Sequence, residues 1–112
     1  MAKKTIAIDL DGVLDEYVKF DESEIPKIKN GAFEFIKKLN DLDYDLVLFT
    51  TRKPKLATQW LIENNLENYF SDVTNVKPVA VMYIDDRAIQ FNGDYDETLK
   101  EIENFNVYWK DK

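Results

Sequence analysis

The chain has 112 residues, which is the size of one domain, so we expect a single domain over residues 1–112. Hydrophobic residues make up 45% of it and charged residues 33%, so the chain can bury a core. It contains neither cysteine nor histidine, which excludes disulfides, thiolate or imidazole zinc sites, cysteine nucleophiles and histidine general bases. Acid–base chemistry must therefore come from carboxylates, lysine or tyrosine.

The net charge of −7, from 15 basic and 22 acidic side chains, disfavours nucleic acids and anionic membranes as partners. A phosphate group can still bind if a divalent cation supplies positive charge locally. No apolar run approaches the length of about 18 residues that a membrane span requires. Residues 1–4 lead into a strand-like run without the apolar stretch of a signal peptide. These features predict a cytoplasmic protein that has no membrane partner.

Strand-like and helix-like segments alternate along the chain. Short apolar segments rich in β-branched residues predict buried strands, and apolar residues at three- and four-residue steps predict helices. The predicted strands are 5–10, 45–49, 79–84 and a last short one at 107–109. The predicted helices are 31–42, 54–64 and 94–102, the last with Asp94 and Glu97 as a capping box. This order predicts an α/β fold: a single-domain, Rossmann-like three-layer sandwich with a mostly parallel sheet, helices on both faces and no cap domain.

Carboxylates follow two of the predicted strands. Asp9 and Asp11 are two residues apart, so their side chains leave the same side of an extended chain. Asp85 and Asp86 end the third strand and join them if the two strands are neighbours, because ligands bind beyond the carboxyl ends of parallel strands. Ionised carboxylates at one place repel each other unless a hard cation such as Mg²⁺ lies between them. The sequence therefore predicts a Mg²⁺ site.

Groups able to hold a phosphate are predicted at the same end of the sheet. Thr50, Thr51 and Arg52 follow the second strand, and Lys77 precedes the third. A hydroxyl and an ammonium group placed there supply the positioning and charge stabilisation that phosphoryl transfer needs. In a chain without cysteine or histidine, a carboxylate is the natural covalent nucleophile.

Four segments resemble, in the same order, the motifs of the haloacid dehalogenase superfamily of phosphohydrolases: DLDGVL from Asp9, FTTR around Thr50, Lys77-Pro78, and YIDD ending at Asp86. The resemblance implies a Mg²⁺-dependent phosphatase in which Asp9 forms an aspartyl-phosphate. It implies that Asp11 protonates the leaving oxygen and then deprotonates the attacking water. It also implies that Thr50 binds the phosphoryl group and Lys77 neutralises it. The implied metal residues are Asp9, Asp11, Asp85 and Asp86, with Asp86 favoured as the direct ligand. The implied substrate-binding residues are Gly12, Thr50, Thr51, Arg52 and Lys77.

Other interpretations stay open. Asp9 and Asp11 also suit a turn or helix cap, and Thr51 suits a cap of the following helix equally well. The acidic stretch that begins at Asp15 is interpreted as a solvated loop. Structural roles, as ion-pair or packing residues, are favoured for Arg87, Trp60 and Trp109. A receiver-like phospho-acceptor domain is disfavoured, because its adjacent acidic pair comes first along the chain. A non-catalytic binding module that kept the fold remains an alternative.

The spacing of the motifs leaves no room for a lid domain. Asp11 and Thr50 are separated by 38 residues and Thr50 and Lys77 by 26, whereas a lid domain needs about 50 or more. The chain therefore resembles the capless members of the superfamily, and its substrate is expected to be a small phosphate ester or an exposed phosphate of a larger molecule. The loop 13–30, with Tyr17 and Phe20, is the local candidate to cover the site. A homodimer, in which one subunit covers the other, is a further candidate.

Overall fold

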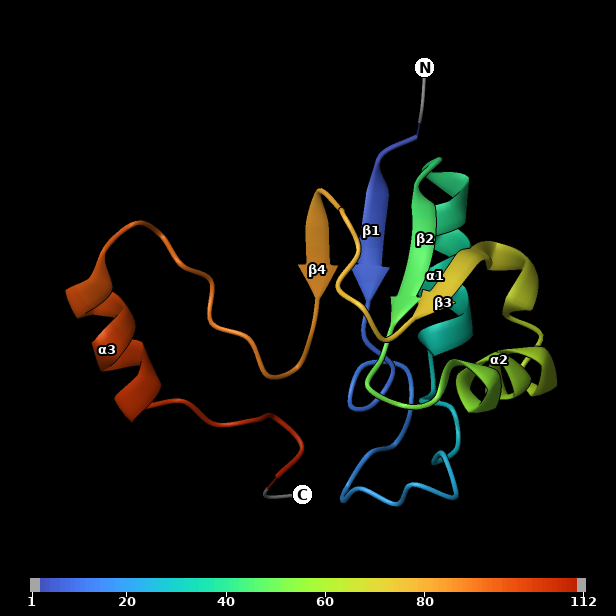
Figure 1. Ribbon diagram of the computed structural model, residues 1–112, viewed down its shortest axis with the longest axis horizontal. Coiled ribbons are helices and arrows are strands. Elements are labelled where there is room, and N and C mark those ends of the chain that lie inside the picture. The colour runs from blue at the N-terminus through green and yellow to red at the C-terminus, as the bar shows by residue number, and fades with distance from the viewer. Residues whose placement is uncertain (1–2, 111–112) are drawn as a thin grey trace.

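The computed structural model describes residues 3–110 (Figure 1). Four parallel strands form one sheet in the order β3-β2-β1-β4. Their bounds are β1 Thr5–Ile8, β2 Asp45–Phe49, β3 Phe70–Thr74 and β4 Met82–Ile84. The helices are α1 Ala32–Asp41, α2 Pro54–Glu63 and α3 Tyr95–Glu103, with a 3-10 helix at Glu67–Tyr69. The predicted Rossmann-like α/β fold with a parallel sheet is confirmed.

The core lies around the two central strands. Ile6 and Ile8 of β1 are in register with Leu46 and Leu48 of β2, so all four side chains share one face of the sheet. These four belong to one buried apolar cluster. The helices contribute to that cluster Ala32 and Ile36 of α1 and Ala57, Trp60 and Leu61 of α2. Burial of Trp60 confirms its predicted packing role.

Local sequence signals mark where each helix begins. Gly31 precedes α1 with a φ of 92°, a left-handed conformation that favours glycine. Pro54 occupies the first turn of α2, where its fixed φ suits the helix and its missing N–H costs no intrahelical bond. Asp94 caps α3, because its side chain accepts a hydrogen bond from the Glu97 N–H at 3.1 Å.

The sequence predictions are wrong for β3, for the start of β4 and for residues 107–109. β3 was not predicted, since its sequence, Phe-Ser-Asp-Val-Thr, is too polar for a buried strand, and it lies at an edge of the sheet. β4 is shorter than the predicted 79–84, and Val79 lies outside it, almost entirely exposed. Residues 107–109 form a turn rather than a strand, because Tyr108 and Trp109 direct their side chains to the loop after β1 and to Asp86.

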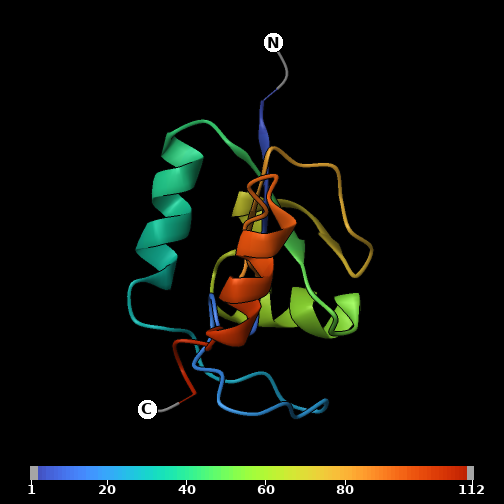
Figure 2. The same ribbon diagram turned by 90° about the vertical axis from the view of Figure 1, so that its left-hand side faces the viewer.

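The last helix lies apart from the rest of the molecule. Figures 1 and 2 show α3 beyond the β4 edge, away from the sheet, with the chain then returning toward the carboxyl ends of the strands. None of the residues of α3 is buried. The loop 13–30, by contrast, is closed on itself by an antiparallel bridge between Asp15 and Ile28, and its Leu14 belongs to the buried core. Within residues 3–110, no helix is both long and apolar enough to cross a bilayer.

Candidate active site

The carboxyl ends of β1 and β4 bring three carboxylates together. The two strands are neighbours, and the N–H of Asp9 continues their pairing by donating to the Ile84 carbonyl at 2.9 Å. Asp85 and Asp86 follow Ile84 directly. One oxygen from each of Asp9, Asp85 and Asp86 lies within 4.8 Å of the other two. The structure thus places three of the four predicted acidic residues in one cluster.

Burial and the neighbouring carboxylates change the ionisation of Asp9. Its pKa is raised from 3.8 to about 8, mainly because burial removes water from the carboxylate, and further because Asp85 and Asp86 lie close to it. The N–H of Leu10, which donates to Asp9 Oδ1 at 2.9 Å, opposes the shift. Burial and the neighbouring carboxylates therefore favour the neutral form of Asp9, and positive charge nearby would favour its ionised form. A carboxyl group with a pKa perturbed in this way marks a candidate functional site.

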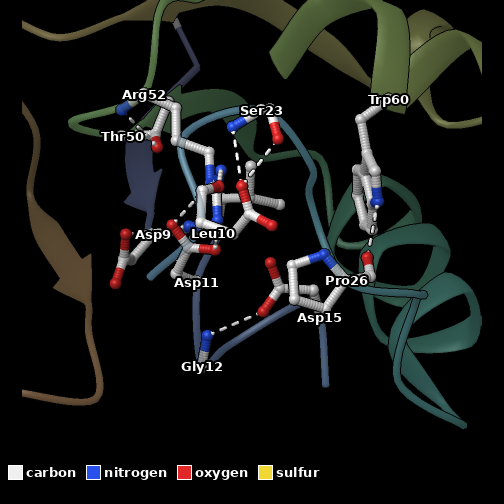
Figure 3. Close-up of polar contacts among 11 residues, drawn as sticks. Asp9, Leu10, Asp11, Gly12, Asp15, Ser23, Pro26, Thr50, Arg52 and Trp60 are labelled. Atoms are coloured by element: carbon white, nitrogen blue, oxygen red, sulfur yellow. Dashed lines mark hydrogen bonds and ion pairs between the residues drawn. The ribbon is translucent and has the colours of Figure 1, made fainter. Parts of the chain in front are cut away.

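The fourth carboxylate, Asp11, is held by an arginine instead. Arg52 Nε lies 2.8 Å from Asp11 Oδ2 and Arg52 Nη2 lies 3.0 Å from Asp11 Oδ1, so the pair is bidentate (Figure 3). The Arg52 side chain is 1% exposed, and its Nη1 donates to the Asp21 carbonyl at 2.7 Å. The geometry places Arg52 against Asp11 as its ion-pair partner.

A cavity of about 360 Å³ adjoins Asp9, a volume within the usual range for small-molecule sites. Its lining consists of Asp9, Asp11, Tyr17, Phe20, Phe49, Thr50, Thr51, Asp85 and Arg87. Asp9 and Asp11 thus face one space, as their two-residue spacing predicts. The loop 13–30 forms one wall through Tyr17 and Phe20, the two side chains expected to reach a ligand. The ring of Phe20, which is more than half exposed, lies 5.0 Å from the guanidinium carbon of Arg52.

The two threonines after β2 differ in their surroundings. Thr50 is buried, and its Oγ1 accepts a hydrogen bond from the Arg52 N–H at 3.1 Å. Its hydroxyl proton can still be donated to an oxygen in the cavity. Thr51 is exposed at the rim. The residue that caps α2 is Lys53, so Thr51 is not the cap that was the alternative for it.

The C-terminal segment completes the acidic cluster, which the sequence did not indicate. Trp109 Nε1 donates to Asp86 Oδ2 at 2.6 Å, and the Tyr108 hydroxyl donates to the Gly12 carbonyl. Gly12 has a φ of 84°, and a Cβ there would collide with the Asp86 carboxylate. Gly12 is therefore required for close approach of the two strand-end loops. A single tryptophan in a short apolar segment carries no motif that reveals such a contact.

Arg87 brings a second guanidinium to the site. Its guanidinium carbon lies 5.2 Å from the ring of Tyr17 and 5.2 Å from that of Trp109, which themselves meet edge to face. Its Nε is 3.9 Å from Asp86 Oδ2, a distance that makes a weak ion pair. Arg87 thus combines the predicted structural role with a position on the cavity wall.

The interpretation of Asp15 as part of a solvated loop is wrong. Asp15 is 0% exposed, and its Oδ1 accepts a hydrogen bond from the Gly12 N–H at 3.0 Å (Figure 3). Its Oδ2 has no hydrogen-bond partner. Burial, together with the neighbouring Asp11 carboxylate, raises the pKa of Asp15 to about 8. Burial therefore favours the neutral form of Asp15, which holds the turn after β1 through its bond to Gly12.

Lys77 lies outside the cavity beside Asp9. Its Nζ is 4.7 Å from the centre of the Tyr83 ring, in a separate hollow of about 770 Å³ alongside β4. Phe49 and Asp85 line both spaces, so the two hollows adjoin. Lys77 belongs to the connection between β3 and β4, which is exposed and leaves its side chain outside the core. Neutralisation of a phosphoryl group by Lys77 stays a prediction.

Comparison with known proteins adds information on the fold. The chain matches no protein-family model and no curated protein. Among solved structures it is similar to a conserved protein from Bacteroides thetaiotaomicron, with a TM-score of 0.62 and 23% sequence identity. The match covers 96% of this chain and 95% of the other. At this identity the similarity shows a shared fold over nearly the whole length of both chains.

Proposed function

We propose that the protein is a Mg²⁺-dependent phosphatase that hydrolyses phosphomonoesters through an aspartyl-phosphate on Asp9. The observation that carries the proposal is the placement of Asp9, Asp85 and Asp86 within 4.8 Å of one another beside a cavity. Asp9, Thr50 and Asp11 all line that cavity, and in the proposal they would supply the nucleophile, a hydroxyl donor and the acid–base group. The order of the four segments that resemble haloacid dehalogenase motifs supports the same chemistry.

The residues that would hold the cation are Asp9, Asp85 and Asp86. Their oxygen-only donor set suits Mg²⁺, which prefers carboxylates and water over nitrogen or sulfur. Burial, together with the neighbouring Asp85 and Asp86, raises the pKa of Asp9 to about 8, and a cation bound there would favour the ionised carboxylate. A bound Mg²⁺ supplies the charge that lets a phosphate dianion approach three carboxylates.

In the proposed reaction, an Asp9 oxygen attacks phosphorus and the bond from phosphorus to the ester oxygen breaks. Asp11 gives a proton to the departing ester oxygen. Water then attacks the phosphorus of the aspartyl-phosphate, Asp11 takes the water proton, and phosphate leaves as Asp9 is regenerated. The Thr50 hydroxyl holds a phosphoryl oxygen during both steps. Because both Asp11 oxygens contact Arg52 in the structure, Asp11 must turn away from Arg52 to act as the acid.

The test is turnover of a panel of phosphate esters with Mg²⁺, measured on the wild type and on Asp9→Asn. Asp9→Asn should stay folded and lose turnover by at least about a thousandfold, since it removes the nucleophile. Asp41→Asn, at the far end of α1 from the site, is the matched control and should keep full activity (Figure 1). Full activity in Asp9→Asn would refute the proposal. Mg²⁺-dependent binding of beryllium fluoride without turnover would favour the non-catalytic module.

The roles of the two β4 carboxylates are distinguishable by metal affinity. The Asp86 side chain is 2% exposed and held by Trp109, whereas Asp85 is exposed and accepts a hydrogen bond from the Arg87 N–H at 2.8 Å. Asp86→Ala should weaken Mg²⁺ binding at least tenfold more than Asp85→Ala, because a fixed ligand loses less freedom on binding. Isothermal titration with Mg²⁺ measures both. The opposite ranking would assign Asp85 as the direct ligand.

A further inference from the structure

The second part of the chain adopts a defined conformation while its apolar side chains stay exposed. Among residues 67–110 no hydrophobic residue is buried, whereas every buried hydrophobic residue of the described structure lies before residue 67. Eleven large apolar side chains between Val76 and Tyr108 are exposed. Ordering so many residues costs conformational entropy that only burial of apolar surface offsets. A chain with this surface therefore requires a partner that covers it.

Two apolar surfaces within this part do not meet each other. One is the edge strand β4 with its approach, where Val81, Met82 and Tyr83 line the hollow of about 770 Å³. The other is α3, whose Tyr95, Leu99 and Ile102 lie at helical spacing on one face, all more than half exposed. Figure 1 shows α3 well to one side of β4, and Figure 2 shows it standing in front of the sheet edge.

Residues 87–108, which carry α3, form an arm that projects from the sheet and whose two ends are held together by the contact between Asp86 and Trp109. It leaves the sheet after Asp86 and returns at Trp109, which donates a hydrogen bond to Asp86. The radius of gyration reflects the projection, because it is 14.9 Å against about 13 Å for a compact chain of this length. An arm anchored at both ends presents its apolar face to another molecule rather than to its own core.

We propose that the partner is a second copy of this chain, arranged about a two-fold axis, with α3 of each copy packed against β4 of the other. One chain carries both an apolar helix face and an apolar strand edge, and a two-fold arrangement covers both pairs at once. The six exposed side chains named on the two surfaces, at roughly 100 Å² each, supply about 600 Å² per chain, or about 1,200 Å² for the pair. Specific, stable interfaces bury about 1,200–2,000 Å² in total. The proposal does not depend on the chemistry at the Asp9 cluster.

Light scattering coupled to size-exclusion chromatography at physiological salt tests the state of association. The wild type should have twice the chain mass of 13.2 kDa. Leu99→Glu/Ile102→Glu should be monomeric and keep the far-ultraviolet circular dichroism of the wild type. Leu42→Glu, an equally exposed leucine at the end of α1, is the matched control and should remain dimeric. A monomeric wild type, or a dimer that survives the α3 substitutions, would overturn the proposal.

Disulfide cross-linking tests which surfaces meet. The chain has no cysteine of its own, so only the introduced cysteines can form a disulfide. Chains with Leu99→Cys and chains with Met82→Cys are mixed and oxidised, and mass spectrometry should find a disulfide joining the two kinds of chain. A chain carrying both cysteines separates the proposed exchange from closure of α3 onto its own strand. A disulfide that forms within the doubly substituted chain, with none between the singly substituted chains, would refute the exchange.

Discussion

Replacing Asp15 by asparagine should make the free energy of unfolding less dependent on pH, because the variant lacks the one proton that Asp15 holds in the folded state. Asp15 is fully buried, and its pKa rises from 3.8 in the unfolded chain to about 8 in the folded one. Between these values the folded state holds a proton that the unfolded state releases, so the free energy of unfolding falls as pH rises. A single proton corresponds to about 1.4 kcal/mol per pH unit, or about 2–3 kcal/mol between pH 5 and 7. Against a typical total of about 5–15 kcal/mol, this loss is easily measured.

The asparagine variant keeps the geometry while removing the titration. Its side-chain oxygen can still accept the Gly12 N–H, which Asp15 accepts at 3.0 Å. Urea unfolding at pH 5, 6 and 7, with EDTA present, gives the slope for each protein. Asp9, whose pKa is also raised to about 8, contributes equally to both, so the difference in slope belongs to Asp15. Asp41→Asn should match the wild type. Equal slopes in Asp15→Asn and the wild type would show that Asp15 is ionised when folded, and would refute the reasoning.

Two further predictions concern the groups around the acidic cluster. Arg52→Lys should lower the free energy of unfolding, measured in urea, by about 1–3 kcal/mol. Lysine cannot make the bidentate contact to Asp11 together with the hydrogen bond to the Asp21 carbonyl. An unchanged stability would show that the Arg52–Asp11 ion pair does not stabilise the fold. In a Trp60→Phe chain, Mg²⁺ should change the fluorescence of Trp109, whose indole donates to Asp86, and Asp86→Ala should abolish the response. A Trp109→Phe chain, which retains Trp60, should not respond, and an equal response there would separate Trp109 from the cation.

The elements that could be predicted from the sequence are those whose local pattern agrees with their environment. β1 and β2 are apolar and β-branched because both faces of a central parallel strand are covered. α2 was predicted from Pro54 and a single apolar stripe. β3 was missed because it is an edge strand in which Ser71 and Asp72 are exposed. It forms by pairing with β2, and the local sequence does not indicate that pairing.

The candidate site could be predicted where carboxylates directly follow a strand that the sequence also indicates. Asp9, Asp85 and Asp86 meet because β1 and β4 are neighbours, which was the condition that the sequence set for their meeting. Asp15 was misinterpreted because a run of acidic residues usually indicates a solvated loop, and burial of one member depends on the hairpin formed with Ile28. The Trp109 contact spans 23 residues and depends on how far the arm projects before it returns, which periodicity does not encode.

The site joins a stable strand, β1, to a less stable one, β4, so it depends on the stability of the end of β4. The nucleophile proposed at Asp9 extends a strand of the buried core, whereas Asp85 and Asp86 extend a three-residue strand in the part of the described chain that has no buried hydrophobic residue. Few buried contacts mean low local stability, so the end of β4 is where the site is most easily lost. Trp109 counters this by fixing Asp86. A cation held jointly by the β1 and β4 carboxylates would tie the exposed part of the chain to the core, and would stabilise the fold by mass action, with the logarithm of its concentration relative to its Kd.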